Sequence, residues 1–242
     1  MVFSTAVSAA ETLTSQTLAS KTLASKIDET PIQLTIVDQH NKPLANAVIE
    51  YSFAQSLVQN ASEAPRLNSF KDQGVKTNAQ TTYIMDQVNK QFEPHVLIVP
   101  QNSLVNFPNS DDIRHHVYSF SPAITFELKL YSGRPKQPIL FQQPGIVTIG
   151  CNIHDAMVGY IYVTNATAAV KSDAQGKAVL FTETSKNIEL KIWHPNNAKG
   201  LNHHRRITLT PAMVANNETV FSLSITEPKA RDSFEELNIH DH

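Results

Sequence analysis

Apolar and polar residues alternate in the first patterned stretch of the chain. Residues 32–36 read Ile-Gln-Leu-Thr-Ile, which is the period of a β-strand with one buried face. Residues 38–43 (Asp-Gln-His-Asn-Lys-Pro) predict a turn, and residues 47–53 predict a returning strand. Residues 54–81 are polar and have no period, so we expect a loop there.

Further short apolar or alternating stretches follow, separated by turn residues such as Pro100, Gly133 and Gly145. No long stretch has the period of an amphipathic helix. Many short strands at this spacing are typical of a β-sandwich or barrel, so the pattern predicts an all-β fold. The predicted strands are 95–99, 103–107, 117–120, 126–131, 146–151, 160–164, 177–181, 188–193, 206–209 and 219–225.

Length and charge narrow the classes of protein to which this chain can belong. Its 242 residues allow one large domain or two small ones, and 41% apolar residues are enough for a hydrophobic core. No run of eighteen apolar residues occurs, so we expect no membrane span. The net charge of −2 comes from interspersed acidic and basic residues, whereas a nucleic-acid surface needs a basic stripe.

The first residues indicate export. An apolar stretch over residues 1–7 leads into Ser8-Ala9-Ala10, a pattern like that at a signal-peptidase site. Because the stretch is short and has no positive flank, we expect the start to lie inside a longer signal peptide of a periplasmic protein. The alternative is a disordered cytosolic tail. Residues 17–21 and 22–26 both read Thr-Leu-Ala-Ser-Lys, a composition typical of a spacer.

Cysteine is the informative residue type, because the chain has only one. In an exported protein, Cys151 is a reactive thiol, an intermolecular link or a metal ligand. Cys151, His154 and Met157 follow one another at intervals of three residues, and a loop that leaves a strand at Cys151 can turn all three toward one point. A thiolate, an imidazole and a thioether together favour copper. Singly, a Cys or a Met is more often an ordinary buried residue.

Three ligands from one loop need a fourth from elsewhere in the chain. His115 and His116 both stand at the head of the predicted strand 117–120 and could supply it. Two imidazoles and a thiolate in a plane, with a weak axial methionine, define a type-1 (blue) copper site for electron transfer. Such a site has no open position for a substrate, so we expect no enzyme activity.

Residues 92–164 resemble a plastocyanin-type cupredoxin, which is a Greek-key β-sandwich. The resemblance rests on Val105-Asn106-Phe107-Pro108-Asn109, His115-His116-Val117, Pro144-Gly145, the segment 151–157 and the closing strand 159–163. The short gap between His154 and Met157 is similar to that of amicyanin-like members. With Ile192-Trp193-His194-Pro195, the whole chain also resembles bacterial proteins labelled methylamine-utilisation or plastocyanin-like.

The resemblance implies one copper ion, held by His115, Cys151, His154 and Met157. His116 falls where the family usually has an Asn that ties the two ligand loops together. His116 as the ligand in place of His115 is the alternative.

The segments on either side resemble the two halves of a transthyretin-like β-sandwich. They carry the turns Lys42-Pro43-Leu44 and Asp173-Ala174-Gln175-Gly176-Lys177, with Asn41 where Gly is usual. The resemblance implies a discontinuous sandwich with the cupredoxin inserted into it, and the alternative is two β extensions packed on the cupredoxin. The predicted parts are a signal remnant and spacer (1–29), a first half (30–56), a loop (57–81), the cupredoxin (82–165), a second half (166–228) and a flexible tail (229–242).

The expected function is one-electron transfer between redox partner proteins outside the cytoplasm. We expect a monomer that meets its partners through a weak, transient interface at a small apolar patch around Ala156 and Val158. The alternative is copper storage, delivery or resistance. In that case the histidines of His203-His204-Arg205-Arg206 and of the terminal His240-Asp241-His242 would be auxiliary sites, rather than solvated loop residues.

Overall fold

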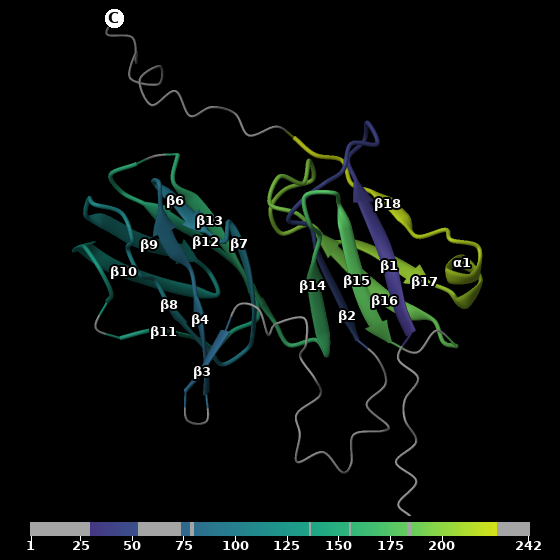
Figure 1. Ribbon diagram of the computed structural model, residues 1–242, viewed down its shortest axis with the longest axis horizontal. Coiled ribbons are helices and arrows are strands. Elements are labelled where there is room, and N and C mark those ends of the chain that lie inside the picture. Colours follow the sequence, from purple (N-terminus) through teal and green to yellow (C-terminus); the bar gives the residue numbers. More distant parts are fainter. Residues whose placement is uncertain are drawn as a thin grey trace, which may run out of the picture.

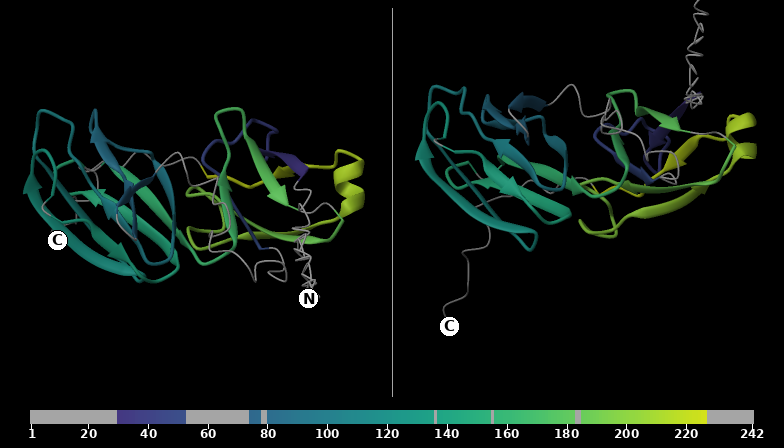
Figure 2. Two further views of the ribbon diagram at one scale, coloured as in Figure 1. Left: turned by 60° about the horizontal axis from the view of Figure 1, so that its bottom comes forward. Right: turned by 90° about the horizontal axis from the view of Figure 1, so that it is seen from below.

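The computed structural model describes residues 30–52, 74–77, 80–135, 137–154, 156–182 and 185–226. Within these ranges the all-β prediction is confirmed, because strands dominate and the one helix, α1 (Pro211–Ala215), is short. Figures 1 and 2 show two β lobes side by side. We call residues 74–164 the central lobe, and residues 30–52 together with 168–226 the flanking lobe.

Two sheets form most of the central lobe. One has the strand order β10-β9-β12-β13-β7 and the other the order β11-β8-β4-β3, while β5 and β6 form a two-stranded sheet. The strands are β3 (Gly74–Thr77), β4 (Gln80–Ile84), β5 (Asp86–Val88), β6 (Gln91–Glu93), β7 (Val96–Pro100), β8 (Ser103–Asn106), β9 (His115–Ser121), β10 (Ile124–Tyr131), β11 (Ile139–Phe141), β12 (Gly145–Cys151) and β13 (Val158–Thr164).

The flanking lobe combines strands from both sides of the central lobe in sequence. The strand β1 pairs with β15 and β18, and β2 pairs with β14 and β16. The two sheets have the orders β15-β1-β18 and β14-β2-β16-β17. The domain limits stay a prediction. The strands are β1 (Thr30–Val37), β2 (Val48–Ser52), β14 (Ala168–Lys171), β15 (Lys177–Thr182), β16 (Ile188–Trp193), β17 (Arg205–Leu209) and β18 (Val220–Ser222).

An apolar contact joins the two lobes around Trp193, which ends β16 and is fully buried. Its ring centroid lies 5.9 Å from that of Tyr160 and 5.5 Å from that of Tyr162, both on β13. The indole N–H donates to the carbonyl of Leu201 at 2.6 Å, so its polar atom is satisfied inside the junction. The strand that follows the proposed ligand loop therefore packs directly on the flanking lobe.

A buried carboxylate adds a polar link to this junction. Glu50 of β2 accepts hydrogen bonds from Thr164 Oγ1 at 2.6 Å, Lys191 Nζ at 2.7 Å and the Tyr162 hydroxyl at 3.3 Å. Burial acts to raise the pKa of Glu50, but the hydrogen bonds from Lys191 and Thr164 outweigh it and hold that pKa below its ordinary value. The charged carboxylate is thus bound from both lobes at once.

One stretch differs from the prediction. Residues 54–81 are expected to be loop, yet β3 spans Gly74–Thr77 and β4 begins at Gln80. These polar residues form strands because β4 pairs in parallel with β8, with Thr82 opposite Leu104, and this partner lies far along the chain. Residues 53–73 lie outside the described part, as do 1–29 and 227–242, so the predicted signal remnant and tail stay untested.

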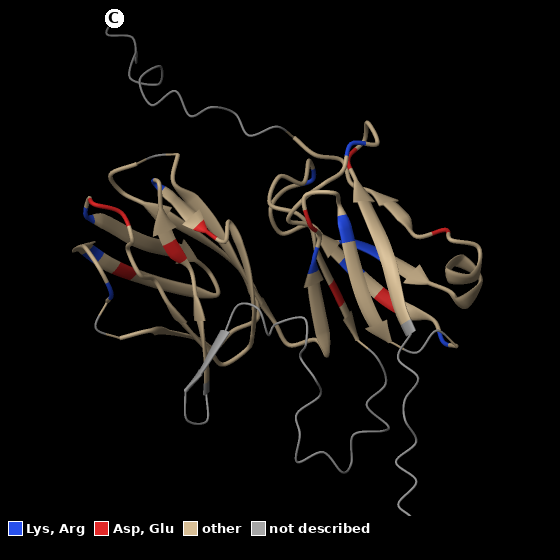
Figure 3. Cartoon of the chain, in the orientation of Figure 1, with Lys and Arg blue, Asp and Glu red and all other residues tan. Residues whose placement is uncertain are grey.

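Charged residues of both signs are interspersed over both lobes in Figure 3, and no basic stripe marks the described residues. In the described ranges, no helix has the length and apolar character that a bilayer span requires.

Candidate metal centre

Three strand ends bring the predicted ligands together. The strand β9 begins at His115, β12 ends at Cys151 and β13 begins at Val158. Because β9 and β12 are antiparallel neighbours with Val117 opposite Cys151, the start of one strand lies beside the end of the other. Residues 152–157 connect β12 to β13 at this same end of the strands.

The loop is closed by its own backbone. Met157 donates its N–H to the His154 carbonyl at 2.9 Å, and Cys151 donates its N–H to the Met157 carbonyl at 3.2 Å. These bonds fold the loop back on itself, so that Cys151, His154 and Met157 belong to one tight turn. The spacing of three residues therefore places the three positions in one loop, while their roles as ligands stay a prediction.

Two imidazoles face the cysteine sulfur with their Nδ1 atoms. The Nδ1 of His115 lies 3.6 Å from Cys151 Sγ, and that of His154 lies 3.9 Å from the same sulfur. One ligand atom from each of these residues lies within 4.8 Å of the others. A metal bound to imidazole at about 2.0 Å and to thiolate at about 2.3 Å would set these atoms about 3.7 Å apart at a trigonal angle. The two sulfur–nitrogen distances therefore fit residues that would hold one metal ion.

Burial differs sharply among the four predicted ligands. His115, Cys151 and Met157 are 0%, 3% and 1% exposed, while His154 is half-buried at the surface. Desolvation, together with the neighbouring His115, lowers the pKa of His154 below its ordinary value. This favours the neutral imidazole, the form that binds a metal. Met157 belongs to the same apolar cluster as Cys151, so its thioether is kept from solvent.

The two adjacent histidines lie on opposite faces of β9. His116 pairs through Nε2 with Glu127 Oε1 at 2.9 Å on the outer face, away from the Cys151 cluster. Its carbonyl accepts the N–H of Asn152 at 3.2 Å, which ties the two ligand loops through the backbone. The structure therefore groups His115, and not His116, with the cysteine.

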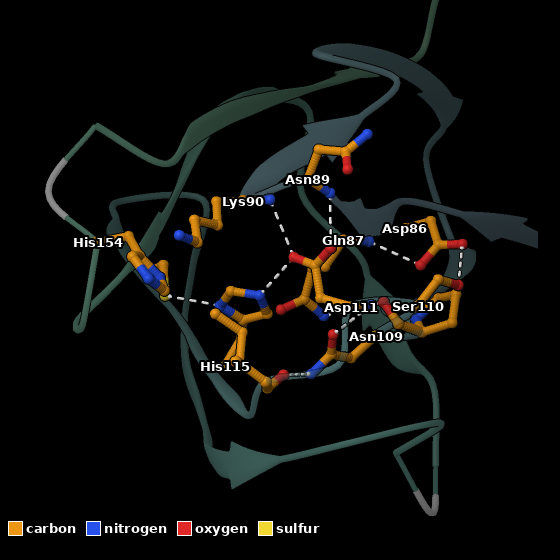
Figure 4. Close-up of polar contacts among 12 residues, drawn as sticks. Asp86, Gln87, Asn89, Lys90, Asn109, Ser110, Asp111, His115 and His154 are labelled. Atoms are coloured by element: carbon orange, nitrogen blue, oxygen red, sulfur yellow. Dashed lines mark hydrogen bonds and ion pairs between the residues drawn. The ribbon is translucent and has the colours of Figure 1, made fainter.

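A carboxylate absent from the sequence prediction contacts the centre. Asp111 Oδ2 lies 2.7 Å from His115 Nε2, the ring nitrogen that faces away from Cys151 (Figure 4). The signal available in the sequence was an acidic residue four positions before the candidate ligand, in the turn that precedes its strand. Burial acts to raise the pKa of Asp111, but hydrogen bonds from the Lys90 backbone and from His115 outweigh it and lower that pKa.

The proposed auxiliary histidines do not form a second cluster in the described part of the chain, where His115, Cys151 and His154 are the one group with metal-site spacing. His204 Nε2 lies 3.0 Å from the Tyr162 hydroxyl and is half-buried, so it is part of the lobe junction rather than a solvated loop residue. His240 and His242 lie outside the described residues.

No protein-family model matches the chain, and no curated protein matches it either. Among solved structures, the chain is similar to a copper-containing nitrite reductase from Thermus scotoductus, with 24% identity and a TM-score of 0.33, over 39% of this chain and 26% of that one. It thus spans about a quarter of the nitrite reductase.

Two smaller proteins show the same partial likeness. A purple cupredoxin from Nitrosopumilus maritimus is 19% identical with a TM-score of 0.30, over 34% of this chain and 98% of that one. A reduced amicyanin variant is 22% identical with a TM-score of 0.30, over 37% of this chain and 86% of that one. At such TM-scores these similarities carry no argument about the site, which rests on its own geometry.

Proposed function

We propose that this protein is a type-1 copper protein that carries single electrons between redox partners outside the cytoplasm. The observation that carries the proposal is the convergence of His115 Nδ1 and His154 Nδ1 on the sulfur of Cys151. A buried Met157 closes the same loop.

The donor set favours copper over magnesium and calcium. A thiolate and a thioether are soft ligands that suit copper, whereas magnesium and calcium take oxygen ligands. The copper ion would supply a change of one electron between two oxidation states. His115, Cys151, His154 and Met157 would hold the ion, and four protein donors would leave no position for a substrate. This supports a carrier rather than an enzyme.

Strand pairing and backbone hydrogen bonds hold three of the four proposed ligands, all of them buried. His115 and Cys151 are held at paired strand ends, and Met157 is held by two backbone hydrogen bonds within the loop. A site that rearranges little between oxidation states transfers electrons with a small reorganisation cost. His154 reaches the surface and is the proposed exit for the electron.

Apolar residues around His154 support a weak docking surface. Ile153 and Ala156, on either side of His154 in the loop, are exposed, and Val158 is half-buried. A small apolar patch here would suit a transient encounter, because electron-transfer complexes have small interfaces. The periplasmic location is proposed from residues 1–10 alone, which lie outside the described part.

The test is a titration of purified apo-protein with Cu(II), followed by visible absorption, beside Cys151→Ala. We expect an intense blue band in the wild type and none in the variant, because the band arises from thiolate-to-copper charge transfer. Reversible cycling between oxidation states would support the carrier. A colourless protein that binds copper tightly would overturn the blue-site proposal and favour copper storage or delivery.

A further inference from the structure

The buried ring of His115 has a polar contact at each nitrogen. Its Nδ1 faces Cys151 Sγ at 3.6 Å, and its Nε2 faces Asp111 Oδ2 at 2.7 Å. An ionised carboxylate can only accept hydrogen bonds, so Nε2 must carry the proton. The neutral ring then has its lone pair on Nδ1, directed at the cysteine.

The carboxylate of Asp111 is itself held in place by a turn. The backbone N–H of Asn89 donates to Oδ1 at 2.6 Å, and that of Lys90 donates to Oδ2 at 2.9 Å. Asn89 and Lys90 connect β5 to β6 with φ values of 53° and 60°. A lysine in this left-handed region is uncommon, which indicates that the surroundings hold the turn in this shape. Figure 4 shows both amides directed at the carboxylate.

A second set of bonds fixes the backbone on which Asp111 stands. The Oδ1 of Asn109, which is 5% exposed, accepts the Asp111 N–H at 3.1 Å. The Nδ2 of Asn109 donates to the carbonyls of Ile113 and Tyr131, both at 2.8 Å. The segment between Asn109 and His115 therefore has little freedom to rotate the carboxylate away from the imidazole.

We propose that Asp111, held by the β5–β6 turn, is the positioning residue of the metal centre. It fixes the Nε2–H tautomer of His115 and so directs Nδ1 at the metal. It also places a negative charge on the far side of the His115 ring from the metal. The inference rests on the proposed function. Hydrogen-bonded carboxylates orient metal-ligating histidines and raise their basicity. A fixed negative charge stabilises the more positive Cu(II) state and lowers the reduction potential.

Two variants separate orientation from charge. Asp111→Ala removes the acceptor, so we expect the His115 tautomer to become mixed and copper affinity to fall about 10–100-fold. Asp111→Asn keeps an oxygen toward His115 but removes the charge, so affinity falls less and the reduction potential rises. Asp112→Asn, at the neighbouring position, is the matched control and should behave as wild type. All proteins are compared at one pH near neutrality.

The measurements are nitrogen-15 NMR of the His115 ring in the apo-protein, a competition titration with Cu(I), and the reduction potential of the copper-loaded form. Thermal unfolding checks that each variant folds. If Asp111→Ala does not fold, Asp111→Asn carries the test through its potential. Wild-type tautomer, affinity and potential in the Asp111 variants would overturn the inference. Because the tautomer is read without metal, a protein that lacks a blue band would refute the proposed function while leaving this inference testable.

Discussion

His115 and His116 show how much a single position matters on a strand. Successive side chains point to opposite faces, so one of two adjacent residues on β9 turns toward the buried Cys151 and the other turns outward to Glu127. His115 is completely buried, whereas the His116 side chain is 18% exposed. Two chemically identical residues therefore have different surroundings.

Replacing each of the two histidines in turn tests whether only His115 is a ligand. His115→Ala should abolish the blue band, because it removes a proposed ligand and leaves a cavity beside Cys151. His116→Ala should keep the band and cost about 0–1 kcal/mol of stability, because it removes only a partly exposed ion pair. Visible titration and thermal unfolding measure both effects. Loss of the blue band in His116→Ala, with the band kept in His115→Ala, would make His116 the ligand.

At the scale of elements, the hairpin β5–β6 is small yet supports the metal centre through Asp111. Its anchor is Gln87, which is fully buried in the middle of β5. The Nε2 of Gln87 donates to the carbonyl of Pro108 at 2.9 Å and to the Tyr131 hydroxyl at 2.6 Å. Tyr131 in turn donates to the Phe107 carbonyl at 2.6 Å, so one side chain ties the hairpin to β10 and to the segment before the ligand strand.

We expect Gln87→Leu to destabilise the protein by about 1–3 kcal/mol, because the half-buried Tyr131 hydroxyl loses its donor and the Pro108 carbonyl keeps only the backbone N–H of position 87. Since the hairpin also carries the amides that bind Asp111, copper affinity should fall as well. Denaturant unfolding of the apo-protein and a copper titration test the two effects. Thr125→Ala, an exposed change on β10, is the control. Unchanged stability would show that the hairpin does not depend on Gln87.

At the scale of the whole molecule, the junction between the lobes buries titratable groups. His194 follows Trp193, is 6% exposed, and contacts the Ala45 carbonyl through Nε2 at 3.1 Å. Burial lowers the pKa of His194 to about 4 from an ordinary value of 6.5, against the opposing effect of the Ala45 hydrogen bond. The nearby His95 lowers it further, so the folded protein holds His194 neutral.

A pH dependence of stability follows from this shift. Below pH 6.5 His194 binds a proton in the unfolded chain, whereas in the folded protein it binds that proton only near pH 4. Stability is therefore full above pH 6.5 and falls as the pH drops toward 4, by up to about 3 kcal/mol from His194. Glu50 adds a loss at lower pH, since its depressed pKa means that protonation breaks its bonds.

Unfolding of the apo-protein at several pH values measures this loss. His194→Gln, which can keep a donor toward Ala45, should make the profile less steep between pH 6.5 and 4, the range that the shift defines. His40→Gln, in an exposed turn, should keep the wild-type profile. A variant at His194 with the wild-type slope would place the pH dependence elsewhere in the molecule.

The sequence by itself determined the local features of this protein. Alternation with a period of two predicted most strands, because a strand with one buried face needs that pattern wherever its partners lie. The residues Cys151, His154 and Met157 could be grouped in advance for a similar reason: they share one short loop, and its length limits how far apart they can lie. Their roles as ligands stay a prediction.

The tertiary structure alone decided every feature that depends on a distant partner. The strand β4 was missed because its polar residues become a strand only when β8 supplies the hydrogen bonds. Asp111 was missed because its contact with His115 depends on the turn at Asn89 and Lys90, which lies elsewhere in the chain. That His115 rather than His116 lies beside Cys151 follows from the register of β9 against β12, whereas its role as a ligand stays a prediction. A register shift of one residue exchanges the two faces of a strand, and local periodicity carries no information about which strand lies beside it.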